Sequence, residues 1–149
     1  IFVVLNIDFM IIAVDFDGTI VEHQYPDIGK ERLFAIETLK ALQNHGCRLI
    51  LWTYRTGKEL QEAIEFCRKR GIEFYAVNKN YPEEVFNENT VSRKINADVY
   101  IDDKNVGGFP GWSKIWQILA PHIGADPLST SEKKIEDDKK SLFKRIFNY

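Results

Sequence analysis

Cysteine is scarce in this sequence, with two in 149 residues, and neither sign of charge predominates. Cys47 and Cys67 have neither metal-ligand spacing nor the density of a secreted disulfide framework. Lys and Arg number 20 against 22 Asp and Glu, and a formal net charge of −2 supplies no general field to attract long nucleic acid or an acidic membrane. The composition therefore favours a cytoplasmic protein with a small-molecule partner.

We expect neither a membrane span nor a secretion signal in the amino-terminal stretch. Its apolar amino-terminal stretch, residues 1–14, is too short to span a bilayer; no basic residue precedes it, Asp8 interrupts it, and no small-residue cleavage site follows before Asp15. We expect residues 11–14 to form a strand. Two alternatives stay open for residues 1–9, an added edge strand or an extension upstream of a start at Met10.

Short apolar runs alternate with longer amphipathic segments, which is typical of a parallel sheet covered by helices. The expected strands are residues 11–14, 47–54, 72–77 and 97–101, and the expected helices are residues 30–46, 57–71 and 112–124. A polar, aperiodic stretch at 78–96 is expected to be a loop. We predict an α/β fold, a three-layer Rossmann-like parallel sheet with helices on both faces, in one catalytic domain at residues 10–124.

The remaining carboxyl-terminal segment, residues 125–149, is expected to be a charged amphipathic tail. Its basic pairs stand beside apolar residues, so binding to a membrane surface or to another subunit is one interpretation. Docking back on the domain, or plain disorder, is the milder one.

Polar side chains follow three of the expected strands at their carboxyl ends. These groups are DFDGT at 15–19, TYRTG at 53–57 and the acidic pair at 102–103. Ligands of an open parallel sheet bind at that edge, so we expect the three groups to converge. Asp15 and Asp17 flank a buried Phe16 and precede Gly18, which permits a tight turn. Carboxylates so placed can share a divalent cation.

Taken together, these motifs resemble those of the haloacid-dehalogenase-like superfamily of phosphohydrolases, over about residues 10–119. A hydrophobic strand followed by DFDGTI is similar to the first motif, and Thr53 closing LILWT to the second. Lys94 in SRKINADVY is similar to the third motif, with Arg93 as the alternative, and VYIDD to the acidic fourth. The resemblance implies a small bacterial phosphatase that uses Mg²⁺.

The resemblance also implies roles for individual residues. Asp15 is the nucleophile that forms an aspartyl-phosphate, and Asp17 is the general acid and base. Thr53 and Lys94 are the implied phosphate ligands. The implied magnesium ligands are Asp15, Asp17 through its carbonyl, Asp102 and Asp103. These roles are physically reasonable because a hard cation prefers oxygen ligands and neutralises the charge of a carboxylate approaching a phosphate.

Further substrate contacts are expected at Gly18, Thr19, Arg55 and Thr56. Arg55 suits a second anionic group of the substrate, with a helix cap or an exposed side chain as the alternatives. His23 either faces the substrate or is a solvated loop histidine, and Asn105 is a candidate to support metal-bound water.

The chain leaves no room for a cap domain. The intervals from Asp15 to Thr53 and from Thr53 to Lys94 are each filled by a helix and a strand or loop. Relatives without a cap tend to admit large substrates or to rely on a partner subunit, so a homo-oligomer could cover the open site. We predict hydrolysis of a phosphorylated metabolite, a sugar phosphate or a nucleotide. The alternatives are a phosphotransferase, a polynucleotide-end phosphatase, and a non-catalytic regulatory domain that binds Mg²⁺ and phosphate.

Overall fold

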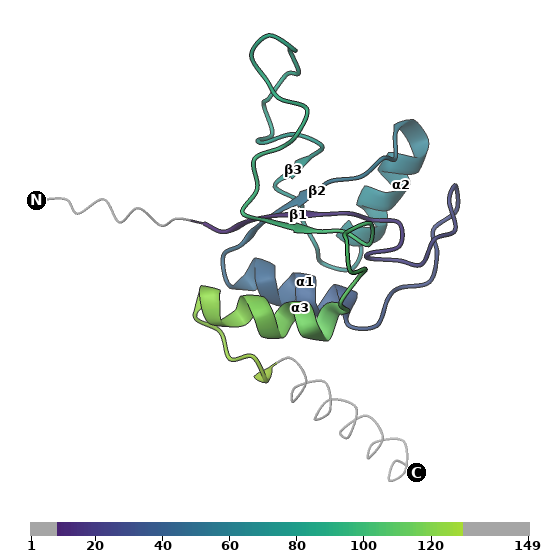
Figure 1. The fold of residues 1–149 in the computed structure, drawn as a ribbon. Coiled ribbons are helices and arrows are strands. Elements are labelled where there is room, and N and C mark those ends of the chain that lie inside the picture. The colour runs from purple at the N-terminus through teal and green to yellow at the C-terminus, as the bar shows by residue number, and fades with distance from the viewer. Residues whose placement is uncertain (1–8, 130–149) are drawn as a thin grey trace, which may run out of the picture.

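A computed structural model of the chain describes residues 9–129 (Figure 1). Its core is a four-stranded, all-parallel sheet with the order β3-β2-β1-β4. The strands are β1 (Ile11–Val14), β2 (Arg48–Leu51), β3 (Ala76–Val77) and β4 (Val99–Ile101). The helices are α1 (Ala35–Asn44), α2 (Gly57–Arg68), α3 (Trp112–Leu119) and the 3-10 helix η1 (Ala120–Ile123). The predicted α/β class and parallel sheet are confirmed.

The central strand β1 sets the register of the sheet. Ile11 to Val14 pair with Arg48 to Leu51 of β2, and Ile12 to Val14 pair with β4 on the other side. Both faces of β1 are buried, because Ile12, Ala13 and Val14 are all at most 1% exposed. A strand covered on both faces has no alternation of apolar and polar residues, which explains its continuous apolar sequence.

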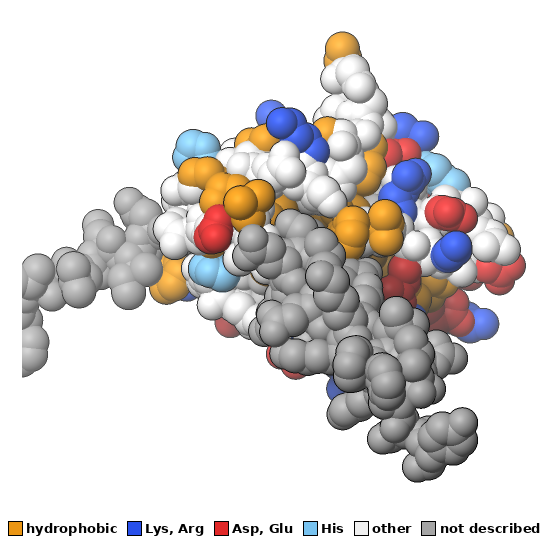
Figure 2. Space-filling view, turned by 90° about the horizontal axis from the view of Figure 1, so that it is seen from below, with side chains coloured by type: hydrophobic (Ala, Val, Ile, Leu, Met, Phe, Trp, Pro, Cys, Tyr) orange, Lys and Arg blue, Asp and Glu red, His pale blue; other side chains and the backbone are white. Residues whose placement is uncertain are grey.

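All three α-helices pack on the same face of the sheet. Ile12 and Leu49 on that face belong to one buried group with Leu39 of α1, Cys67 of α2 and Trp116 of α3. Figure 1 shows α1 and α3 side by side below the sheet. Figure 2 views the molecule from the side of α1 and α3, and in the coloured part of this view hydrophobic side chains form small separate groups among side chains of other kinds.

The opposite face is covered differently, and here the prediction of helices on both faces is wrong for the described residues. Ala13 and Ile50 point to this face and pack with Ile95 and Ala97 of the connection between β3 and β4. That connection runs on the side of the sheet away from α1 and α3 (Figure 1). Right-handed crossovers from β1 to β2 to β3 place both intervening helices on one face, whereas the return to β4 must cross the other. The returning segment has no helical period, so a loop fills this layer.

Element boundaries also differ from those expected. The third strand is shorter than predicted, because only Ala76 and Val77 pair with β2. Helix α1 begins at Ala35 because Phe34, with φ 64°, breaks the helical path before it. The predictions for residues 1–8 and 130–149 lie outside the described residues. In the part of the chain that the structure describes, no helix combines the length and apolar character needed to cross a bilayer.

Candidate active site

Three carboxylates converge where β1 and β4 end. Asp15 follows β1, and Asp102 and Asp103 follow β4; one oxygen from each lies within 4.8 Å of the others. The Asp15 amide donates to the Ile101 carbonyl at 2.9 Å, which extends the pairing of the two strands to this edge. The carboxylates lie in a cavity of about 390 Å³. It is lined by Asp15, Asp17, His23, Trp52, Thr53, Tyr54, Asp102, Asp103 and Lys104.

Buried Thr19 joins the first acidic motif to the last. Its hydroxyl donates to the Asp15 carboxylate at 2.8 Å and accepts from the Asp103 amide at 3.0 Å. Its carbonyl accepts from the indole of Trp112 at 2.8 Å. Thr19 was expected to contact the substrate, but its side chain is fully buried and its hydroxyl is engaged, so it positions the acids instead.

Gly18 is also required by the fold around the site. Its φ of 89° is a conformation that side chains disfavour, and an added Cβ would lie 2.3 Å from His23 Nε2 and 2.4 Å from Asp103 Oδ2. The absence of a side chain therefore lets the loop pass directly beneath the acidic group. The proximity of Gly18 to His23 and Asp103 is a property of the loop, and the expected contact of Gly18 with the substrate stays a prediction.

Asp103 has basic neighbours. His23 Nε2 lies 2.9 Å from its Oδ2, and the ammonium of Lys104 lies 3.4 Å from the same oxygen. Burial raises the pKa of the Asp103 carboxyl, but the hydrogen bond with His23 and the neighbouring Lys104 outweigh it and hold the pKa below its usual value. Its other oxygen, Oδ1, is buried and has no hydrogen-bond partner among the described residues. One acceptor in the acidic group is thus left unsatisfied.

Asp15 behaves in the opposite way. Burial raises the pKa of its carboxyl from 3.8 to about 6, against the lowering effect of the hydrogen bonds from Thr19 and the Phe16 amide. The charges of Asp102 and Asp103 add to the increase. The ionised form of Asp15 is therefore costly in the protein alone, and a nearby cation would relieve that cost.

Asp17 is not a member of this acidic group. Both of its oxygens accept from the guanidinium of Arg55, at 2.6 Å from Nε and 2.7 Å from Nη2. The Arg55 side chain is fully buried, and its other N–H groups donate to the carbonyls of Pro26, Asp27 and Glu59. The guanidinium is therefore not available to hold a second anionic group of a substrate. The expectation that Arg55 binds such a group is wrong.

The residues near the second motif are placed unequally. Thr53 lines the cavity; its amide donates to Asn78 Oδ1 at 2.8 Å, and its hydroxyl accepts from the Arg55 amide at 3.2 Å. Thr56 is exposed at the N-terminus of α2 and does not line the cavity. Asn105 donates to the Asp102 carbonyl at 2.8 Å, which supports the acidic loop.

The third motif is not brought to the cavity. Lys94 is exposed and its ammonium lies 5.5 Å from the centre of the Tyr100 ring, while Arg93 lies over the ring of Phe86 at 4.6 Å. Of the described Lys and Arg residues, Lys104 lines the cavity. Sequence comparison by motif spacing missed it, although its position directly after the acidic pair was a usable signal.

Trp52 and Tyr54 are two further lining residues that the sequence reasoning missed. Both flank Thr53, so their proximity to the second motif could have identified them. Trp52 is half-buried, whereas the side chain of Tyr54 is fully exposed.

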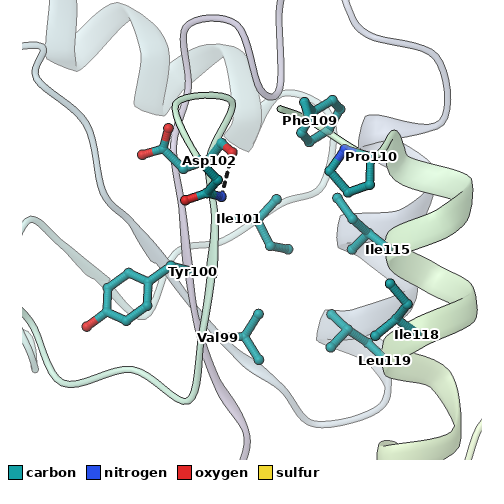
Figure 3. Close-up of a pocket in the computed structure, with 10 residues that line it drawn as sticks. Val99, Tyr100, Ile101, Asp102, Phe109, Pro110, Ile115, Ile118 and Leu119 are labelled. Atoms are coloured by element: carbon teal, nitrogen blue, oxygen red, sulfur yellow. Dashed lines mark hydrogen bonds between the residues drawn. The ribbon is translucent and has the colours of Figure 1, made fainter. Parts of the chain in front are cut away.

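A second, smaller cavity of about 140 Å³ lies between β4 and α3. Figure 3 shows Ile101 and Val99 pointing from β4 toward Ile115 and Leu119 of α3, with Asp102 at the upper end of the strand. Apart from Asp102 and Asn105 its lining is largely apolar. It therefore offers fewer ionisable groups than the cavity around Asp15.

Comparison with known proteins gives one informative match. No protein-family model and no curated protein matches the chain. Among solved structures, the chain is similar to that of a conserved protein from Bacteroides thetaiotaomicron, with 60% sequence identity and a TM-score of 0.70. The match covers 75% of this chain and 90% of that one.

Proposed function

The chain belongs to the family of this conserved Bacteroides thetaiotaomicron protein, and we propose that it is a Mg²⁺-dependent phosphomonoesterase of the haloacid-dehalogenase-like type. One observation carries the proposal: the carboxylates of Asp15, Asp102 and Asp103, from motifs far apart in the sequence, converge within 4.8 Å at the carboxyl edge of a parallel sheet. This is the edge at which open parallel sheets bind ligands. The proposed catalytic domain, residues 10–124, has no cap.

The acidic group fits a small hard cation. Its donors are carboxylate oxygens, which Mg²⁺ prefers, and within residues 9–129 neither Asp15 nor Asp102 forms an ion pair with a Lys or Arg. Asp103 Oδ1 is a buried acceptor without a partner. Asp15, Asp102 and Asp103 would hold the ion, with the Asp17 carbonyl as a further proposed ligand. When bound, the cation neutralises the charge of the reacting phosphate.

Asp15 is the proposed nucleophile. One of its oxygens attacks phosphorus, the bond from phosphorus to the leaving oxygen breaks, and an aspartyl-phosphate forms. Water then attacks phosphorus, which releases inorganic phosphate and restores the carboxylate. The hydrogen bond from Thr19 fixes the orientation of Asp15 before the substrate arrives.

Asp17 is the proposed proton carrier. It gives a proton to the leaving oxygen in the first step and takes one from water in the second. Arg55 occupies one acceptor position on each Asp17 oxygen, and a carboxylate has further lone pairs that can accept a proton or a water. Arg55 thus holds Asp17 at the cavity wall without using all of its capacity.

The phosphate ligands we propose are the Thr53 hydroxyl and the Lys104 ammonium. Both residues line the same cavity as Asp15, whereas Lys94 does not. A phosphate held between a hydroxyl donor and an ammonium is a common arrangement for phosphoryl transfer.

Release of phosphate from p-nitrophenyl phosphate tests the proposal. The wild-type protein should release phosphate only with Mg²⁺, a chelator should stop turnover, and added Mg²⁺ should restore it. Asp15→Asn should abolish release while circular dichroism shows a folded protein. Metal-independent release, or full activity of Asp15→Asn, would refute the mechanism. Analysis of products with an added alcohol separates a phosphatase from a phosphotransferase.

A reducing, cytoplasmic setting is part of the proposal. Cys47 and Cys67 are both buried and unpaired, and burial raises the pKa of the Cys67 thiol to about 12. A thiol of that kind is unreactive because little thiolate forms.

A further inference from the structure

The cavity around Asp15 is lined by two chemically different kinds of side chain. The four aspartates, with His23 and Lys104, supply charge, whereas Trp52 and Tyr54 supply aromatic surface. The two rings come from the segment just after β2, one residue to either side of Thr53. Because Trp52, Thr53 and Tyr54 line the same cavity, a phosphate bound at Thr53 would have its leaving group in the space that both rings border.

The fold does not use the Tyr54 ring. Its side chain is fully exposed, so it contributes nothing to the buried core, whereas Phe16, Trp112 and Trp116 are buried there. Trp52 is held differently, because it packs against Ala13 and Ile50 on the loop-covered face of the sheet. One ring is thus fixed and half-covered and the other is free, an arrangement suited to a flat group that stacks on an aromatic surface.

The charges of the cavity limit the rest of the substrate. Among the described residues that line it, Lys104 is the one Lys or Arg, since Arg55 is buried against Asp17 and Lys94 lies over Tyr100. His23 already contacts Asp103. One phosphate can be matched by these groups and a bound cation, but a second anionic group would face aspartates without a partner.

Building on the proposed phosphatase activity, we propose that the substrate class is a nucleoside monophosphate, whose base stacks on Tyr54 and Trp52 while its single phosphate lies at Asp15, Thr53 and Lys104. Stacking of a base on an aromatic side chain tolerates any base because each has a flat face. Tyr54 is then a specificity residue. It acts on binding and takes no part in the transfer of the phosphoryl group.

The test compares adenosine 5′-monophosphate with ribose 5-phosphate, which share the phosphate and the sugar and differ by the base. Each is titrated into the whole protein with Mg²⁺, and tryptophan fluorescence is recorded. Trp52 is the reporter, because Trp112 and Trp116 are each 1% exposed. The wild-type protein should bind the nucleotide about tenfold or more tightly than the sugar phosphate.

Three variants identify the source of that preference. The preference is the dissociation constant of ribose 5-phosphate divided by that of adenosine 5′-monophosphate. Tyr54→Ala should reduce this ratio by about tenfold, and Tyr54→Phe, which keeps the ring, should leave it unchanged. Tyr81→Ala is the matched control, because Tyr81 is also an exposed tyrosine but does not line the cavity. Equal binding of both probes by the wild type, or an unchanged ratio in Tyr54→Ala, would overturn the inference.

The inference and the proposed function can fail separately. If phosphate release from p-nitrophenyl phosphate depends on Asp15 and Mg²⁺ but the protein shows no preference for the base, the phosphatase activity is supported and the nucleotide substrate is refuted. If the protein shows a preference for the base of about tenfold that Tyr54→Ala abolishes, but releases no phosphate, the nucleotide-binding site is supported and the phosphatase activity is refuted.

Discussion

Asp15→Asn should stabilise the metal-free protein near neutral pH, although Asp15 is the proposed nucleophile. The pKa of the Asp15 carboxyl is 3.8 when free and about 6 in the folded protein, chiefly because the side chain is buried. Between those values the folded chain keeps a proton that the unfolded chain has lost. The free energy of unfolding therefore falls as pH rises through this window, and the loss is complete above about pH 6.

The size of the effect follows from the two pKa values. At about 1.4 kcal/mol per pKa unit, the difference corresponds to about 3 kcal/mol. An amide has the same shape as the carboxyl, can still accept the Thr19 hydrogen bond and carries no charge at any pH. The variant should therefore exceed the wild type in free energy of unfolding by up to about 3 kcal/mol at about pH 7.5, and by less than about 1 kcal/mol at about pH 4.

Urea unfolding in the presence of a chelator, followed by circular dichroism at both pH values, measures this difference. Groups that titrate in both proteins cancel when the two are compared. Addition of Mg²⁺ should reverse the order at neutral pH, because a cation at the acidic group stabilises the ionised wild type more than the variant. A variant that is less stable than the wild type at about pH 7.5, or a difference that does not change with pH, would refute the reasoning about Asp15.

Two other substitutions examine the neighbours of the acidic group. Arg55→Met should lower the free energy of unfolding by about 3–5 kcal/mol in urea titrations, because it leaves the Asp17 carboxylate unpaired next to the core; the exposed Arg68→Met is the matched control and should change little. A loss for Arg55→Met no larger than the control would contradict the structural role of the pair. In assays of p-nitrophenyl phosphate hydrolysis, Lys104→Ala should raise KM by about tenfold, while Lys94→Ala should leave KM near the wild-type value. The reverse result would show that Lys94, and not Lys104, is the phosphate ligand.

Much of the helical face of the fold could be predicted from local sequence. The apolar run at 11–14 became β1 with the expected bounds, and the second predicted helix begins at Gly57 as expected. The layer opposite could not be read in the same way. This face is covered by the connection between β3 and β4, because the chain crosses it on the way back to β4. The local sequence pattern does not predict the direction of that crossing.

The candidate site shows the same division. Asp15, Asp102 and Asp103 could be placed together because each directly follows a strand of the sheet, and adjacent parallel strands end at one edge. The partner of Arg55 could not be foreseen, because its contact with Asp17 depends on how two loops pack. Lys104 lines the cavity because it directly follows the acidic pair, a signal that lies outside the motif spacing we used.

Three of the hydrogen bonds of Thr19 couple the acidic group to the core. The hydroxyl contacts Asp15 and the Asp103 amide, while the carbonyl contacts the indole of Trp112 at the start of α3. The spacing of the carboxylates and the position of that helix therefore cannot change independently. Cation affinity should consequently respond to substitutions in the packing beneath α3, so that the binding of a small ion reports on the integrity of the folded domain.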